Sequence, residues 1–282
     1  MPDDIFNQIG RIIAKKGYSG VSKDAAEWIT FLSNTEKKAV QTAVFEPIQS
    51  QTLRQTPVIQ PISEEIAVPR KSTPVPQSAP AETTAPTVPP PPVQTDAADI
   101  PELQKNVMQC RMCKLANTRK NIVFGEGNPQ ARLMFIGEAP GADEDESGRP
   151  FVGRAGQLLT KMINAMQFTR EEVYIANVIK CRPPFNRNPE PDEVACCMPF
   201  LEEQIRLVNP ECIVLLGAIA TRFLLKHEGA MGKIRGTWQS YKNIPVMVTY
   251  HPSFLLRTES AKRDAWQDLQ KVMAKFGKFH KK

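Results

Sequence analysis

Cysteines are the first residues of this sequence whose types and spacing could do chemistry, and all six lie beyond residue 109. Cys110 and Cys113 form a C-x2-C pair that can hold a metal ion, although two packed thiols in a turn are the alternative. Cys181 and the adjacent Cys196 and Cys197 could complete a four-thiolate site. The second half lacks the spacing of a zinc knuckle, and scattered thiolates also suit a 4Fe–4S cluster. The chemistry of the residues alone leaves zinc and 4Fe–4S open.

Only one residue of the Cys196–Cys197 pair is expected to bind metal, because neighbouring side chains on a helix point about 100° apart. Cys212 begins an apolar run and is predicted to be a small core residue. Reduced thiols in the cytoplasm more often bind metal or pack than form disulfides, so we expect no disulfide framework.

A glycine-rich and acidic segment follows the first long apolar run of the C-terminal part. It begins GEAPG at residues 137–141 and ends SGRPFVG at residues 147–153, before a helical pattern. Glycines let the backbone approach a ligand, and the amides at a helix entry favour an anion. No GxGxxG follows the strand and no GxxxxGK[ST] occurs, which excludes a dinucleotide fingerprint and a P-loop. The segment therefore predicts a ligand loop of unspecified chemistry.

The elements that would position these residues alternate between strands and helices. Apolar runs predict four short buried strands of a mostly parallel sheet at 132–137, 173–179, 212–217 and 245–249. Helical patterns lie near 155–166, 192–208, 218–226 and 260–276. This alternation predicts an α/β fold, a three-layer α/β/α sandwich around a four-stranded sheet. Ligands bind such sheets beyond the carboxyl ends of the strands. The loops after Gly137 and Thr249 lie there, and Asn177 lies late in its own strand, near the same edge.

Three regions divide the chain. Residues 1–45 show short helical patterns with too little apolar surface for a core of their own, so they are a docking element for a protein partner or a vestigial extension. Residues 46–100 include eleven prolines between Pro57 and Pro92 and are predicted to be a disordered linker. Residues 101–282 are predicted to form the folded domain.

Charge separates the same regions. Residues 101–282 carry 27 Lys and Arg against 19 Asp and Glu, a balance of +8, whereas residues 1–100 carry 9 against 11. A basic domain favours an acidic partner such as nucleic acid, with a charge that serves only solubility as the alternative. No stretch approaches the length of a membrane span and the N-terminus lacks the layout of a secretory signal, so we expect a cytoplasmic monomer that binds no membrane.

Three motifs carry a resemblance to a known family. The segments GEAPGADEDESGRPFVGRAGQLL (137–159), NVIKCRPP (177–184) and HPSFLLR (251–257) resemble those of the family 4 uracil-DNA glycosylases, the iron–sulfur members of the uracil-DNA glycosylase superfamily. The resemblance covers roughly residues 101–275. It implies a DNA-repair enzyme that hydrolyses the N-glycosidic bond of uracil in single- or double-stranded DNA.

The resemblance also implies roles for individual residues. The ligands of a 4Fe–4S cluster would be Cys110, Cys113, Cys181 and Cys197, the last preferred over Cys196 from the motif CMPF. Glu138 would place or polarise the attacking water, and His251 would hydrogen-bond the uracil O2. The substrate-binding residues would be Gly137, Ala139, Phe151 and Asn177.

These residue types suit the reaction. Uracil must be flipped out of a duplex, and stacking on Phe151 would recover part of the unstacking cost. The amide of Asn177 can accept from uracil N3–H and donate to O4, where cytosine presents the opposite pattern. Negative charge accumulates on the departing base, chiefly at O2, and a preplaced donor such as His251 lowers the barrier.

DNA contacts are predicted in the segment Pro252–Arg257. Leu255 and Leu256 would act as a wedge in the minor groove, with helix-entry packing as the alternative, and Arg257 is a candidate for a phosphate contact. Competing functions are a glycosylase of wider substrate range, a non-catalytic iron–sulfur module that binds nucleic acid within the replication or repair machinery, and an iron–sulfur redox sensor.

Overall fold

The computed structural model describes residues 95–278, so the predictions for residues 1–45 and for most of the linker lie outside the described residues. The folded part begins before the predicted boundary at residue 101. Asp99 caps the first described helix by accepting the Glu102 N–H at 2.9 Å, and the Ala97 N–H donates to Glu203 at 3.2 Å. No helix within the described residues is long and apolar enough to cross a membrane.

A six-stranded sheet forms the centre of the domain, in the order β1-β3-β2-β4-β6-β5. Its strands are β1 Glu126–Gly127, β2 Leu133–Gly137, β3 Tyr174–Asn177, β4 Cys212–Leu216, β5 Trp238–Tyr241 and β6 Ile244–Thr249. The four predicted strands are β2, β3, β4 and β6, which pair in parallel, whereas β1 and β5 are antiparallel edges. The prediction of a mostly parallel α/β sheet is therefore confirmed.

The prediction of four strands was wrong, since the described part has six. Both missed strands lie at edges and lack a continuous apolar run: β1 has two residues, and β5 alternates exposed and half-buried positions. A two-residue turn joins β5 to β6, and its residues Lys242 and Asn243 both have positive φ, 46° and 69°. Such a turn matches the twist of a hairpin, but without glycine it gives little signal in a sequence.

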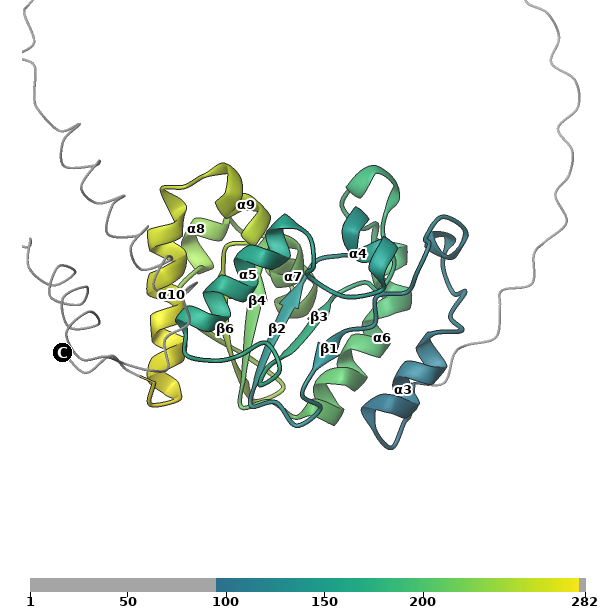
Figure 1. Ribbon diagram of the computed structural model, residues 1–282, viewed down its shortest axis with the longest axis horizontal. Helices are drawn as coiled ribbons and strands as arrows, with labels where there is room; N and C mark the ends of the chain where they lie inside the picture. Colours follow the sequence, from purple (N-terminus) through teal and green to yellow (C-terminus); the bar gives the residue numbers. More distant parts are fainter. Residues whose placement is uncertain (1–94, 279–282) are drawn as a thin grey trace, which may run out of the picture.

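Helices cover both faces of the sheet (Figure 1). They are α3 Ile100–Val107, α4 Ala142–Ser147, α5 Arg154–Ala165, α6 Pro191–Val208, α7 Gly217–Leu225, α8 Met231–Ile234, α9 Pro252–Arg257 and α10 Ala261–Lys275, with 3-10 turns η1 Lys114–Asn117 and η2 Pro184–Asn186. The predicted helices near 155–166, 192–208, 218–226 and 260–276 correspond to α5, α6, α7 and α10.

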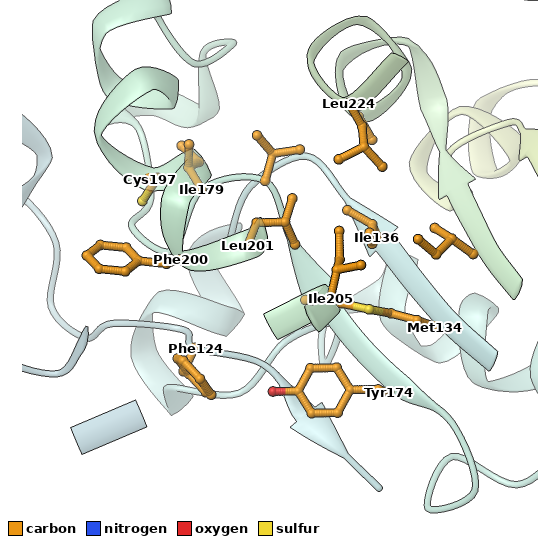
Figure 2. Close-up of a cluster of buried hydrophobic side chains, with 14 of the residues drawn as sticks. Phe124, Met134, Ile136, Tyr174, Ile179, Cys197, Phe200, Leu201, Ile205 and Leu224 are labelled. Atoms are coloured by element: carbon orange, nitrogen blue, oxygen red, sulfur yellow. The ribbon is translucent and has the colours of Figure 1, made fainter. Parts of the chain in front are cut away.

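Two cores lie on opposite faces of the sheet because successive side chains of a strand point to opposite sides. Met134 and Ile136 of β2 pack into the core that α3, α6 and α7 cover (Figure 2). Leu133 and Phe135 pack into the core that α5, α9 and α10 cover. The three-layer arrangement is therefore present.

The carboxyl ends of the parallel strands meet at one edge. Gly137, the last residue of β2, pairs in register with Asn177, the last residue of β3. Leu216 at the end of β4 pairs with Thr249 at the end of β6. The loops after these strands therefore face one another, as expected for a ligand site in a parallel sheet.

Candidate active site

A cavity of about 220 Å³ lies at the carboxyl ends of β2, β3 and β6. The residues that line it come from the end of β3, from the segments that follow these strands, including α4 and the start of α9, and from the start of α5: Glu138, Ala139, Pro140, Gly141, Glu144, Phe151, Ala155, Asn177, Pro183, Asn186, Arg187, His251 and Ser253. All of the predicted catalytic and substrate-binding residues line it except Gly137. Gly137 instead packs against two of them, Asn177 and Phe151.

Asn177 places an unpaired polar atom in the wall of this cavity. The side chain is 2% exposed, and its Oδ1 has no hydrogen-bond partner within residues 95–278. Leaving a buried acceptor unpaired costs about 1–3 kcal/mol. A ligand that presents an N–H group to the cavity would remove this cost.

Because Gly137 has no side chain, Asn177 and Phe151 pack directly against the end of β2. A Cβ on Gly137 would lie 2.5 Å from the Asn177 Oδ1 and 2.5 Å from the Cζ of Phe151. Real Cβ atoms do not approach other atoms so closely, so a side chain here would displace the amide, the ring or both. Glycine at this position is therefore required by the contact between the strand end and the cavity wall.

Phe151 forms an aromatic wall of the cavity. Its backbone has φ 52°, a left-handed conformation that is strained for an aromatic residue, and its side chain is 6% exposed. The ring centroid lies 5.7 Å from that of His251, with the planes tilted by 34°. Gly156 makes this placement possible, since a Cβ there would lie 1.9 Å from the Phe151 carbonyl.

His251 is the N-cap residue of α9, and its hydrogen bonds define its tautomer. Its Nδ1 accepts the Ser253 N–H at 3.1 Å and lies 2.8 Å from the Ser253 Oγ. Burial, and to a lesser extent the positive charge of Arg257, lowers the pKa of His251 to about 4. The ring is therefore neutral near pH 7, and because Nδ1 accepts, the proton sits on Nε2. His251 offers the cavity one N–H donor without a positive charge.

Two glutamates follow β2 and have different roles: Glu138 directly after the strand, and Glu144 in α4. The Glu144 carboxylate accepts the N–H groups of Gly141, Val152 and Gly153 at 3.0, 2.9 and 2.9 Å, and so fixes the path of the loop. The Glu138 carboxylate forms no hydrogen bond within the described part of the chain. Burial raises the pKa of the Glu138 carboxyl. Glu138 is thus the carboxylate that can act on a ligand, since Glu144 is engaged with the backbone.

The residues predicted to contact DNA lie outside the cavity lining. Leu255 is fully buried in the core under α5 and α10, whereas Leu256 is 36% exposed and Arg257 is exposed. Helix-entry packing therefore accounts for Leu255 in this structure. A wedge in DNA stays a prediction that rests on Leu256.

The predicted cluster ligands come from three segments that meet beside the cavity. Cys110 and Cys113 follow α3, Cys181 follows β3, and Cys197 lies in α6 at the edge of the core in Figure 2. Burial raises the pKa of Cys181 to about 11 and that of Cys197 to about 12, and each thiol is also affected by the charge of Cys113. The thiols therefore share one buried region. The Cys196 thiol donates to the Met112 carbonyl at 3.4 Å, and it also lies close enough to Cys113 and Cys110 for their charges to affect one another, so it borders the same region.

Two N–H groups point at the sulfur atoms of this region. The Arg119 guanidinium donates to the Cys181 Sγ at 3.3 Å and to the Cys110 carbonyl at 2.6 Å. The Lys180 N–H donates to the Cys197 Sγ at 3.5 Å. Donors of this kind favour an anionic sulfur, as in a thiolate that binds metal.

Lys180 connects the cysteines to the cavity. Its side chain is 1% exposed, and its Nζ donates to the Asn177 carbonyl at 2.7 Å and to the Gln204 Oε1 at 2.6 Å. The same residue thus holds the backbone of Asn177 and donates to Cys197. The sequence motifs contain Lys180 and Glu144, but neither was predicted to have a role. Only the glutamate three residues after Gly141 gave a local signal, since a glutamate at this helix position can accept the N–H of the N-cap residue.

Comparison with known proteins identifies the family. The family model described as "Uracil DNA glycosylase superfamily" matches residues 124–270. A type-4 uracil-DNA glycosylase of Thermotoga maritima is 46% identical over 176 residues, which are 60% of this chain and 91% of the relative. The chain belongs to the type-4 uracil-DNA glycosylases of this superfamily. A type-4 uracil-DNA glycosylase of Saccharolobus solfataricus is 46% identical over 175 residues, 59% of this chain and 81% of that protein. The family match covers the whole cavity, and it confirms the resemblance that the motifs carry.

Substitution of Gly137 tests the packing of the cavity in this family member. We expect Gly137→Ala to lower the affinity for a uracil-containing oligonucleotide at least about tenfold, since a shift of the Asn177 amide removes a buried hydrogen bond. Gly232→Ala is the control, because a Cβ at Gly232 meets nothing within 4 Å. Equal affinities of the two variants would contradict this account of the cavity.

The depressed pKa of His251 predicts a dependence of stability on pH. The His251 imidazole has a pKa of 6.5 in the unfolded chain and about 4 in the folded chain. Its contribution to the free energy of unfolding is therefore complete above pH 6.5 and is lost as the pH falls toward 4. Between about pH 7.5 and about pH 5.5 we expect the wild type to lose about 1 kcal/mol more unfolding free energy than His251→Gln. Urea unfolding at both pH values measures this difference, and parallel losses in the two proteins would argue against a buried neutral imidazole.

Proposed function

We propose that this chain is a DNA-repair glycosylase that hydrolyses the N-glycosidic bond of uracil in DNA and leaves an abasic site. The observation that carries the proposal is the buried, unpaired Oδ1 of Asn177 in a cavity shared with Phe151, His251 and Glu138. The names of its relatives, type-4 uracil-DNA glycosylases, support the same activity. We further propose that the enzyme acts as a monomer on single- or double-stranded DNA.

Base selection follows from the amide of Asn177. Its Oδ1 would accept from uracil N3–H and its amide N–H would donate to O4, while Phe151 stacks on the ring. Cytosine presents a bare N3 and an amino group at these atoms, so both contacts would be mismatched. Unpaired polar groups in a closed site give strong discrimination, which selects uracil over the normal base.

Bond cleavage places opposite charges on the base and the sugar. Electrons of the C1′–N1 bond pass to the departing uracil, and the Nε2–H of neutral His251 would stabilise the charge that develops on O2. The Glu138 carboxylate, when ionised, would favour the cationic sugar and orient the water that attacks C1′. Water adds to C1′, and its proton leaves to the carboxylate or to solvent. Ala139 lines the cavity and would contact the base, while Gly137 would act through Asn177 and Phe151, which pack against it.

Entry of uracil requires base flipping, which costs a few kcal/mol of unstacking. We propose that Leu256, exposed on α9, fills the vacated stack and that Arg257 binds a neighbouring phosphate. Leu255 would contribute from below as the buried anchor of this helix. Binding should accordingly weaken as the salt concentration rises.

We propose a 4Fe–4S cluster held by Cys110, Cys113, Cys181 and Cys197. The donor set fits: four thiols share a buried region, and Arg119 and the Lys180 N–H donate to two of the sulfurs. Among residues 95–278 no three His, Cys, Asp or Glu side chains converge on a point that could hold a single metal ion. A 4Fe–4S cluster carries each thiolate on a separate iron atom and needs no such convergence. When bound, the cluster would tie the segment after α3 to β3 and α6.

Excision of uracil tests the proposed activity. The full chain, purified without oxygen, should cleave a labelled oligonucleotide at uracil and leave thymine and cytosine intact. Asn177→Ala and His251→Ala should each reduce the single-turnover rate by about 100-fold or more, because each removes a contact to the base or to its developing charge.

The control is Trp238→Ala, since Trp238 is exposed on the edge strand β5 and does not line the cavity. This variant should cleave at the wild-type rate. A folded wild type with bound iron that leaves uracil in place would overturn the enzymatic proposal. It would favour the alternative, a non-catalytic iron–sulfur module that binds nucleic acid.

Iron analysis tests the ligand assignment. Cys197→Ser should lose the broad visible absorption and most of the iron, because it removes a buried ligand, whereas Cys196→Ser should retain about four iron atoms per chain. Both variants alter adjacent positions of α6, so general damage to the helix would affect them alike. The reverse pattern would assign the ligand to Cys196.

A further inference from the structure

Phe185 is an apolar side chain exposed beside the cavity. It lies in η2, the 3-10 turn between β3 and α6, and is 99% exposed. The other large apolar side chains counted as exposed in the described part are Met108, Leu256 and Trp238, at 48%, 36% and 42%. A single exposed apolar side chain is common on protein surfaces and by itself indicates no function, so what matters is the backbone that carries Phe185 and the groups beside it.

The turn that carries Phe185 is held firmly at both ends. Arg182 donates from Nε to the Asn186 Oδ1 at 2.8 Å, and the Asn186 N–H donates to the Pro183 carbonyl at 3.1 Å. Arg187 forms two hydrogen bonds, of 2.9 and 2.6 Å, with the carboxylate of Glu193, which is 0% exposed. The base of the turn is therefore rigid.

The backbone of the turn directs the ring outward. Phe185 and Asn186 both have φ 55°, the left-handed region that residues with a Cβ rarely occupy. Asparagine adopts this conformation readily, whereas a phenylalanine there is strained, and such strain is concentrated at functional sites. The preceding prolines at 183 and 184 limit any relaxation of the turn.

The position of the turn identifies what the ring would meet. The neighbours Pro183, Asn186 and Arg187 line the cavity, so the turn that carries Phe185 borders it. The guanidinium of Arg182 lies on the same turn and, within residues 95–278, bonds only to the Asn186 amide, whereas the charge of Arg187 is paired with the carboxylates of Glu193 and Glu190. An exposed aromatic ring beside a cationic group is the chemistry that binds single-stranded nucleic acid, with stacking on the base and attraction to the phosphate.

We infer that Phe185 forms a stacking subsite for the nucleobase next to the extruded uracil. The inference rests on the proposed function, since it requires a DNA strand that enters the cavity. The subsite would hold the flanking base unstacked from its neighbour while uracil occupies the cavity. It takes any base, because every base offers a face for stacking.

Fluorescence of a flanking base tests the inference in the full chain with its metal. The probe is a single-stranded oligonucleotide with 2′-fluoro-deoxyuridine, which resists cleavage, and 2-aminopurine on its 5′ or 3′ side. Wild type should change the emission at one of these two positions. Phe185→Ala should abolish that change and weaken binding about 5- to 100-fold, the range for loss of one stacked base. Phe185→Tyr should preserve both.

Two further proteins separate stacking from damage to the turn. Phe185→Gly relieves the left-handed backbone and should still lose the emission change, whereas Trp238→Ala, an exposed ring on the far edge strand, should keep it. Wild-type emission and affinity in Phe185→Ala would overturn the subsite, even if the wild type excises uracil. A wild type that shows the emission change but never cleaves uracil would overturn the proposed function and leave the stacking subsite standing.

Discussion

The close approach of β2 and β3 at their carboxyl ends is the constraint on which the site depends. Gly137 and Asn177 pair in register there, and no atom larger than hydrogen fits between the β2 backbone, the Asn177 amide and the Phe151 ring. The amide is thereby fixed by packing, yet its Oδ1 has no hydrogen-bond partner in the described structure. A site that is rigid before the ligand arrives loses little entropy on binding, and the unpaired acceptor makes the right ligand favourable.

The region of the cysteines also helps to hold Asn177 in place, through Lys180. Lys180 holds the Asn177 carbonyl through its side chain and donates from its backbone to Cys197. Burial lowers the pKa of Lys180 to about 8, and the sulfurs of Cys197 and Cys181 oppose that shift. A buried cation needs anionic or dipolar neighbours, and here one neighbour is the residue that would read the base. Lys180 thus contacts both the cysteine region and the backbone of Asn177.

Features that repeat along the chain were predictable from sequence, and features that depend on one close contact were not. The four buried strands give continuous apolar runs, and the motifs around Glu138, Asn177 and His251 place these residues at strand ends. The edge strand β5 was missed because its packing is half-exposed and its turn lacks glycine. Burial of Leu255 was also hidden, since adjacent leucines in HPSFLLR look alike until the direction of α9 is known. The role of Glu144 depends on three amides that only the folded loop brings together.

The two glutamates of one loop show how the fold assigns different tasks to the same side chain. Glu144 meets three N–H groups and becomes part of the framework, whereas Glu138 meets none in the described residues and faces the cavity. Because burial alone raises the pKa of Glu138, its ionised form is held at a cost that a developing positive charge on the sugar would offset. His251 is arranged in the opposite sense: its neutral form is preferred, and its N–H serves a developing negative charge. The cavity thus contains a carboxylate, Glu138, whose ionised form is disfavoured by burial, and a neutral N–H donor, His251. This pair suits cleavage of an N-glycosidic bond, which leaves a cationic sugar and an anionic base.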